Sequence, residues 1–317
     1  MGFQSGLLLL ANGEFNRNFK SIRVDPSGHG NFSSIQSAID SVQPNNKYWT
    51  YINIKAGIYR EKVSIPRDKP YIVLKGEGRQ STMIVWNDHE SLEQSPTFSS
   101  RADNIVVRRI SFVNSYNSPY SKNPRVPAVA ALIAGDKSSF YRCRFSGLQD
   151  TLWDVQGRHY FKKCTIQGAV DFIFGNGQSI YENCEIEVLG SELEPGLQGY
   201  ITAQGRSNPN DPNGFVFKEC IITGSGSAYL GRPWRDYARV LFYNSNLTNI
   251  IHPQGWDAWN SAGHENQLTF AEHGNFGLGS ASFARVKWEK KLDLKELYEL
   301  VSTSFIDGEN WIINQPP

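Results

Sequence analysis

The stretches FYRCRFSGLQD (residues 140–150) and YFKKCTIQGAVD (residues 160–171) are two consecutive copies of one sequence pattern. Aligned on Cys143 and Cys164, each copy places an aspartate, Asp150 or Asp171, seven residues after its cysteine. If each copy is one coil of a solenoid, the two carboxylates stack at about the 4.8 Å spacing of neighbouring parallel strands. Two like charges so close destabilise a fold but suit acid/base or nucleophilic chemistry.

The same pattern recurs further along the chain. IYENCEIEV contains Cys184, FVFKECIITG contains Cys220, LFYNSNLTN has Ser245 at the cysteine position, and VVRRISFVN is a looser upstream copy. These segments are rich in Ile, Val, Phe and Tyr and are bounded by Gly, Asn and Asp, which is typical of strands. Strand-like repeats of about 20–25 residues indicate a solenoid. The regular leucines and helices of a leucine-rich horseshoe are not seen, so we predict an all-β, right-handed parallel β-helix.

Short capping helices are predicted at the two ends of this solenoid, because its core needs polar covers. Apolar residues with helical spacing run from Phe32 to Val42, with a serine near the start. A second helix is indicated over residues 294–301, with Asp293 and Glu296 in capping-box spacing. We expect residues 1–20 to form an N-terminal extension and residues 21–317 one β-helix domain. Residues 95–127 are expected to be loop around one strand.

The four cysteines occupy one repeated position, which predicts free thiols stacked inside the coils as small apolar residues. Strands in register bring cysteines close but with side-chain directions poorly suited to a disulfide. No C-x-x-C pair is present, so no zinc site is expected.

Composition excludes several classes of function. The chain is 39% hydrophobic and 20% charged, which is typical of a folded globular protein. The net charge of +1 gives no indication of nucleic-acid binding. The apolar run from Leu7 to Ala11 is too short for a membrane span and shorter than a signal-peptide core. We therefore expect neither a nucleic-acid nor a membrane partner, and we find no convincing secretion signal.

Common catalytic motifs are absent, and the aspartate pair remains. The chain has no G-x-S-x-G, no H-E-x-x-H and no phosphate-binding Walker sequence. Near the pair, Gln149 precedes Asp150, and LGRPW contains Arg232 and Trp234. An arginine could keep one carboxylate ionised for attack while its neighbour retains a proton. A side-chain amide could stabilise a developing oxyanion, and tryptophans could hold sugar rings.

Four segments together resemble the signature blocks of the plant-type pectin methylesterases. They are GIYRE (57–61), QDTL (149–152), DFIFG (171–175) and LGRPW (230–234), in the family's order and spacing, within a similarity that runs from about Ser21 to the C-terminus. The resemblance implies a right-handed parallel β-helix. It also implies hydrolysis of the methyl esters on the galacturonate units of pectin, with release of methanol and without a cofactor.

The resemblance also implies roles for individual residues. Asp171 resembles the nucleophile, Asp150 the acid and then base, Arg232 the residue that orients Asp171, and Gln149 an oxyanion-hole donor. The aromatic residues expected to bind the polymer are Trp234 and Trp256, followed by Phe174 and Trp153. Pectin and a proteinaceous pectinesterase inhibitor are the expected partners, the protein is expected to be a monomer, and the cell wall is the expected location.

One block departs from the family pattern. The family has Q-A-V-A-L before a G-D, whereas PAVAALIAGD (127–136) has Pro127 in place of the glutamine. Proline has no side-chain donor and no backbone N–H, so half of the oxyanion hole is missing or is supplied otherwise. We expect reduced but not abolished turnover.

Two alternatives remain open from the sequence. One is a pectin-cutting glycosidase of the same fold, since carboxylates about 5–5.5 Å apart suit a retaining glycosidase. The other is a weakly active or inactive wall-binding pseudoenzyme, which Pro127 suggests. Asn31 and Asn246 each begin a glycosylation sequon.

Overall fold

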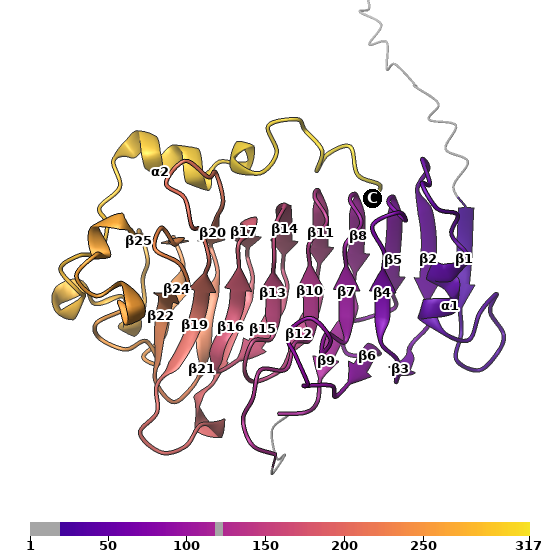
Figure 1. The fold of residues 1–317 in the computed structure, drawn as a ribbon, viewed down its shortest axis with the longest axis horizontal. Coiled ribbons are helices and arrows are strands. Elements are labelled where there is room, and N and C mark those ends of the chain that lie inside the picture. Colours follow the sequence, from indigo (N-terminus) through magenta and orange to yellow (C-terminus); the bar gives the residue numbers. More distant parts are fainter. Residues whose placement is uncertain (1–19, 118–122) are drawn as a thin grey trace, which may run out of the picture.

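Parallel strands wound into successive coils form the body of the protein, which we describe from a computed structural model covering residues 20–117 and 123–317. Three parallel sheets run along its length (Figure 1). The predicted N-terminal extension falls almost wholly on residues 1–19, outside the described residues. From β2 to β24 the chain passes from one sheet to the next in a fixed order that repeats in successive coils. The predicted right-handed parallel β-helix is confirmed.

The three sheets are named here A, B and C. Sheet A contains β1 (Lys20–Val24), β2 (Thr50–Ile54), β5 (Ile72–Gly76), β8 (Ile105–Arg108), β11 (Ser138–Tyr141), β14 (Arg158–Lys162), β17 (Gln178–Glu182), β20 (Gly214–Lys218), β23 (Arg239–Tyr243) and β25 (Thr269–His273). Sheet B contains β3 (Gly57–Tyr59), β6 (Thr82–Trp86), β9 (Ser111–Asn114), β12 (Arg144–Ser146), β15 (Thr165–Gly168), β18 (Glu185–Leu189), β21 (Ile221–Ser225) and β24 (Asn246–Leu247). Sheet C contains β4 (Val63–Ile65), β7 (Phe98–Ser100), β10 (Ala131–Ile133), β13 (Leu152–Asp154), β16 (Val170–Gly175), β19 (Gly199–Gln204) and β22 (Ala228–Pro233).

The repeated cysteine marks the turn from sheet A to sheet B. In each coil the residue before it has left-handed backbone geometry, which bends the chain sharply between two strands. The left-handed residues are Arg142, Lys163, Asn183 and Glu219, with φ of 53°, 55°, 53° and 54°. Arg109 and Asn244 do the same before Ile110 and Ser245, with φ of 58° and 48°. The looser copy VVRRISFVN is therefore a coil of the same kind.

The four cysteines are free and buried, as predicted. Each thiol lies against backbone carbonyls; Cys164 Sγ, for example, contacts the Phe140 oxygen at 3.4 Å. Burial raises the pKa of the Cys164 thiol well above its usual range. The residues thus act as small core groups that meet the carbonyls of the preceding coil.

Stacked aromatic rings fill much of the interior. Phe161 stacks on Tyr181 at 4.6 Å between ring centroids, and Tyr181 stacks on Phe217 at the same distance. Phe242 follows at 4.5 Å from Phe217. Because equivalent side chains lie in register on successive coils, an aromatic residue at one position stacks on its counterpart in the next.

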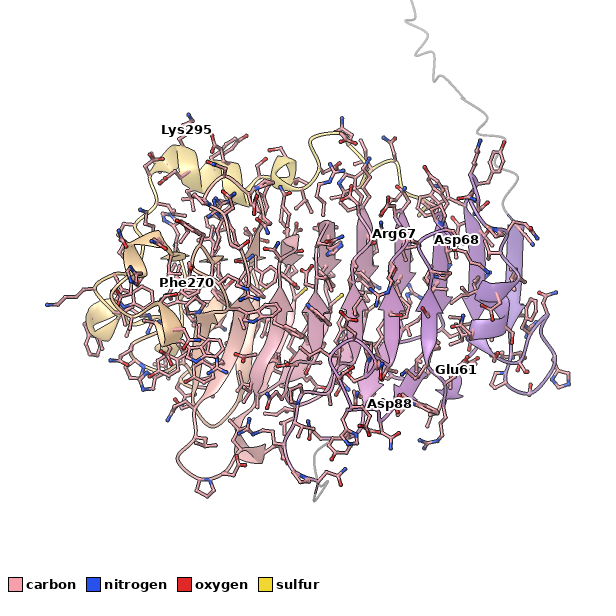
Figure 2. The ribbon with its side chains drawn as sticks, viewed as in Figure 1. Glu61, Arg67, Asp68, Asp88, Phe270 and Lys295 are labelled. Carbon is pink, nitrogen blue, oxygen red and sulfur yellow. The ribbon has the colours of Figure 1, made fainter. Side chains whose placement is uncertain are left out.

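The N-terminal end is covered by α1 (Ile35–Asp40), whose Ile35, Ala38 and Ile39 are buried. Glu61, the last residue of the GIYRE block, accepts hydrogen bonds from the first two helical N–H groups at 2.8 and 3.0 Å. A carboxylate there satisfies free donors and complements the helix dipole. Glu61 lies near this end of the molecule in Figure 2, so we assign it a structural role.

The second predicted helix, α2 (Leu294–Val301), is present with the expected capping box of Asp293 and Glu296. It does not cover the C-terminal end of the core. Its buried Leu297 and Leu300 pack on the outer face of sheet A (Figure 1), because a single apolar stripe fits a flat sheet face. The C-terminal end of the core is filled instead by an aromatic group that contains Trp256, Phe270 and Trp288. Among the described residues, no helix is long and apolar enough to cross a membrane.

A group of buried polar side chains from sheets C and A links three coils. His159 is fully buried, with Nδ1 2.6 Å from the Asp154 carboxylate and Nε2 2.9 Å from the Gly135 carbonyl oxygen. Tyr181 donates to the other Asp154 oxygen at 2.7 Å. Burial alone would lower the pKa of His159, but the Asp154 carboxylate raises it, and the net shift is upward from 6.5. Both ring nitrogens face acceptors, so the imidazolium form is the one that the fold stabilises.

We expect this group to make stability depend on pH. Because the pKa of His159 is raised on folding, its stabilising contribution is complete below about pH 6.5, the usual value for an exposed imidazole. The contribution is lost as pH rises through the higher pKa of the folded state. The Tm difference between the parent and a His159→Gln variant should therefore shrink as pH rises from about 6 to about 9. A difference that is constant over this range would contradict the assignment.

Candidate active site

The two aspartates lie on neighbouring coils where the chain turns from sheet B into sheet C. Gln149 pairs with Val170, and the Asp150 N–H donates to the Val170 carbonyl at 3.0 Å. Farther along, Leu152 pairs with Ile173. Asp150 and Asp171 are therefore in register, as the repeat predicted, at the spacing of adjacent parallel strands, about 4.8 Å.

Both aspartates have strained backbone geometry. Asp150 has φ of 60° and Asp171 has φ of 47°, in the left-handed region that few non-glycine residues occupy. The pairing of β16 with β19 also shifts between Val170 and Ile173, so that two residues of β16, one of them Asp171, oppose one of β19. Such a bulge redirects a side chain out of the regular strand pattern. Strain and a bulge at one residue are typical of functional sites.

Arg232 binds Asp171 through two parallel hydrogen bonds. Its Nε donates to Oδ1 at 2.8 Å and its Nη2 to Oδ2 at 2.6 Å. The guanidinium lies between two aromatic rings, Tyr200 and Trp259, each with its centroid 4.0 Å away. The Tyr200 hydroxyl in turn donates to Asp257 at 2.9 Å. This arrangement restricts the arginine to one position and so fixes the carboxylate that it binds.

The two carboxyl groups have different environments. Burial, together with the negative charge of Asp171, raises the pKa of Asp150 from 3.8 to about 8. Burial also raises the pKa of Asp171, but the two hydrogen bonds and the charge of Arg232 act against that shift. Asp150 receives no comparable hydrogen bonds within the described part of the chain. The pKa of both groups is thus raised, but only Asp171 has a guanidinium bound to it, which favours its ionised form, while Asp150 is the member that favours a proton.

Gln149 has a partner that the sequence analysis missed. Arg125 Nη1 donates to the Gln149 side-chain oxygen at 2.7 Å. With that oxygen occupied, the Gln149 amide nitrogen is the group left to donate, and it has no acceptor among the described residues. The positive charge of Arg125 also opposes the rise in the pKa of Asp171 that burial causes, consistent with its position beside the acid pair.

Three of the four aromatic residues predicted to bind substrate come together on the outer face of sheet C. Trp153 stacks on Phe174 at 5.4 Å, and Phe174 meets Trp234 edge-on at 5.8 Å. Phe174 is only 3% exposed, so the partly exposed tryptophans form the accessible surface.

The prediction for Trp256 is wrong. Its side chain is 1% exposed and stacks on Phe270 at 4.6 Å inside the core. It therefore offers no face to a polymer. Trp259, three residues later and 39% exposed, is the tryptophan that reaches the site, where it covers Arg232. Its φ of 44° is again unusual for a bulky residue.

The residues missed in the sequence carried little local signal. Tyr200 and Trp259 are 32 and 27 residues away from Arg232 in the chain, and no repeat position marks them. Arg125 lies in a segment that was expected to be loop. In the described ranges, no three His, Cys, Asp or Glu side chains are grouped as metal ligands.

A parallel β-helix with two buried aspartates, one of them bound by arginine, is the arrangement expected of a hydrolase that acts through carboxylates. Comparison with known proteins gives the family. A model of the pectinesterase family matches residues 21–309. The chain is 62% identical to "Probable pectinesterase 29" of Arabidopsis thaliana, over 94% of this chain and 90% of that protein. The chain belongs to the pectinesterase family, and the resemblance drawn from the four sequence blocks is confirmed.

Solved structures agree with this assignment. "Pectin methylesterase from Carrot" superposes with a TM-score of 0.87 at 31% identity, over 95% of this chain and 96% of that one. A pectin methylesterase mutant in complex with a hexasaccharide gives a TM-score of 0.77 at 25% identity, over 92% and 97% of the two chains.

The raised pKa of Asp150 predicts that this site destabilises the fold at neutral and alkaline pH. The unfolded chain ionises Asp150 near pH 4, whereas the folded chain does so near pH 8, so stability falls between these values. Asn tolerates the left-handed backbone and cannot ionise. An Asp150→Asn variant should therefore gain on the order of a few kcal/mol over the parent at pH 8 and little at pH 4. Urea unfolding at both pH values measures this, and an equal gain at both would contradict it.

Proposed function

We propose that this protein hydrolyses the methyl esters of galacturonate units in pectin, releasing methanol and leaving a carboxylate. The observation that carries the proposal is the unequal acid pair, with Asp171 bound by Arg232 and Asp150 protonated beside it. Family membership supports the same reaction. The protein would act in the cell wall as a monomer, through the domain of residues 21–317, without a cofactor.

In the first half-reaction, the Asp171 carboxylate attacks the carbonyl carbon of the methyl ester. Negative charge develops on the carbonyl oxygen, where the free amide N–H groups of Gln149 can stabilise it. As the intermediate collapses, the bond to the methoxy oxygen breaks and Asp150 gives that oxygen its proton. Methanol leaves, and an anhydride joins Asp171 to the galacturonate carbonyl.

In the second half-reaction, Asp150 is ionised and acts as the base. It takes a proton from water, and the resulting hydroxide attacks the galacturonate carbonyl carbon of the anhydride. The bond to Asp171 breaks, which regenerates its carboxylate beside Arg232. Asp150 is again protonated, so the site returns to its starting state, and the net reaction consumes one water for each ester.

The polymer would lie across the outer face of sheet C. Trp153 and Trp234 provide flat apolar surfaces on one side of the acid pair, with Phe174 packed between them. Tyr200 and Trp259 flank Arg232. Such rings suit the faces of sugar units. A proteinaceous pectinesterase inhibitor would bind over the same cleft.

An Asp171→Asn variant should release no methanol from highly methylated pectin, because the amide cannot attack the ester.

With the native chain, kcat/KM should fall as pH rises through about 8, because Asp150 then loses the proton that it gives to the departing methoxy oxygen. Methanol release without new reducing ends distinguishes an esterase from a glycosidase. Binding without methanol release at any pH would instead favour the wall-binding pseudoenzyme.

We further propose that Arg125 compensates in part for Pro127. The Ala128 N–H donates to the Gln149 carbonyl at 3.2 Å, which places Pro127 beside the coil of Gln149. Arg125 holds the Gln149 amide oxygen at 2.7 Å, so it fixes the direction of the one remaining glutamine donor. Asn117 anchors this segment through hydrogen bonds to both the N–H and the carbonyl of Val126. Arg125 is thus a positioning residue.

A double-mutant cycle tests this proposal. Pro127→Gln should raise kcat, toward the factor of about 10²–10³ that one oxyanion donor contributes. Arg125→Ala should lower kcat by about tenfold with little change in KM, because an unanchored amide stabilises the transition state less. Arg125→Ala should cost less when Gln is present at 127. Additive effects in the cycle, or a Tm loss that accounts for the lower activity, would contradict the positioning role.

A further inference from the structure

A row of cations follows the corner where sheet A turns into sheet B. Arg109, Arg142 and Lys163 are the left-handed residues of three consecutive coils, and all three are exposed. The N–H groups of Arg109 and Arg142 donate to carbonyls of the next coil, Tyr141 and Lys162, at 3.0 and 2.9 Å. The backbone therefore holds these residues at a regular spacing along the axis of the β-helix.

Two further cations extend the row. Lys75, the exposed residue in register with Arg108, lies on the coil before Arg109. Arg79 reaches across the corner and donates to the Lys163 carbonyl at 3.1 Å. We call Lys75, Arg79, Arg109, Arg142 and Lys163 the cation corner. Three grooves run along it, lined by members of this set; Glu77 lines two of them and Pro317 the third.

The charge of the cation corner is only partly offset by the protein, through Glu77, which lines two of its grooves. Within residues 20–117 and 123–317, none of its five side chains forms an ion pair. The adjacent Lys162, in contrast, pairs with Glu182 at 3.0 Å. The nearby Glu77 accepts a hydrogen bond from the Ala56 N–H at 2.9 Å. Since the whole chain carries a net charge of only +1, this charge is a local concentration.

The corner is separate from the acid pair. Arg142 precedes β12 and Asp150 follows it, so a strand of sheet B, about 10 Å long, lies between the two sites.

The cations of the corner repeat with each coil, about 4.8 Å apart, and this spacing suits a linear partner that carries an anion on each successive unit. The product of the proposed reaction is such a chain, a galacturonan with free carboxylates.

We propose that the cation corner binds de-esterified stretches of galacturonan and so keeps the enzyme on polymer that it has already processed. This identification of the ligand rests on the proposed function. Exposed ion pairs are individually weak, so binding requires several units at once and weakens with salt. A methylated chain lacks the charges and is not retained.

Binding of polygalacturonate and of fully methylated pectin tests the proposal, with the Asp171→Asn protein so that no ester is converted. A variant carrying Arg109→Asn, Arg142→Asn and Lys163→Asn in addition keeps the turn, because Asn183 and Asn244 occupy it in other coils. At low ionic strength this variant should bind polygalacturonate about tenfold more weakly, at roughly 0.5 kcal/mol for each lost contact.

A matched control removes three exposed cations elsewhere, with Lys47→Gln, Arg67→Gln and Lys295→Gln; Figure 2 labels Arg67 and Lys295. The control should keep the affinity of the parent. With Asp171 intact, the corner variant should retain kcat on short methylated oligomers. Equal losses in variant and control, or equal binding of methylated and de-esterified polymer, would overturn the proposal. Failure of the native chain to release methanol would overturn only the proposed function, since binding is measured without turnover.

Discussion

The register between parallel coils is the constraint on which the rest of the structure depends. Six coils turn from sheet A to sheet B at a left-handed residue, and where a cysteine follows, its thiol lies against the coil before it. A shift by one residue would turn every core side chain outward. Because the register is kept, aromatic rings stack on aromatic rings, thiols meet carbonyls, and the two aspartates lie side by side.

The same register destabilises the fold at the acid pair. Stacking two carboxylates in a buried corner raises the pKa of Asp150 to about 8 and strains the backbone at both residues. Arg232 offsets part of this cost by binding Asp171, and two aromatic rings hold the guanidinium in turn. The same geometry that destabilises the fold gives the two carboxyl groups different environments, which is what the proposed nucleophile and proton donor require.

Much of this could be predicted from the chain because a repeat converts sequence spacing into spatial distance. The coils, the free cysteines, both helices and the closeness of Asp150 to Asp171 all follow from local patterns. The position of α2 on sheet A and the burial of Trp256 do not, since both depend on which surface was left uncovered elsewhere. The partners Arg125, Tyr200 and Trp259 come from loops and other coils, where no repeat marks them.

The sequence by itself determined the solenoid and the identity of its acid pair, because periodic apolar residues and turn residues act over short distances. Only the tertiary structure decided the chemical difference between the two aspartates. That difference depends on burial, on the hydrogen bonds of Arg232, and on the bulge at Asp171. Electrostatic energies in a low-dielectric interior depend on the three-dimensional arrangement of groups, which no spacing along the chain encodes.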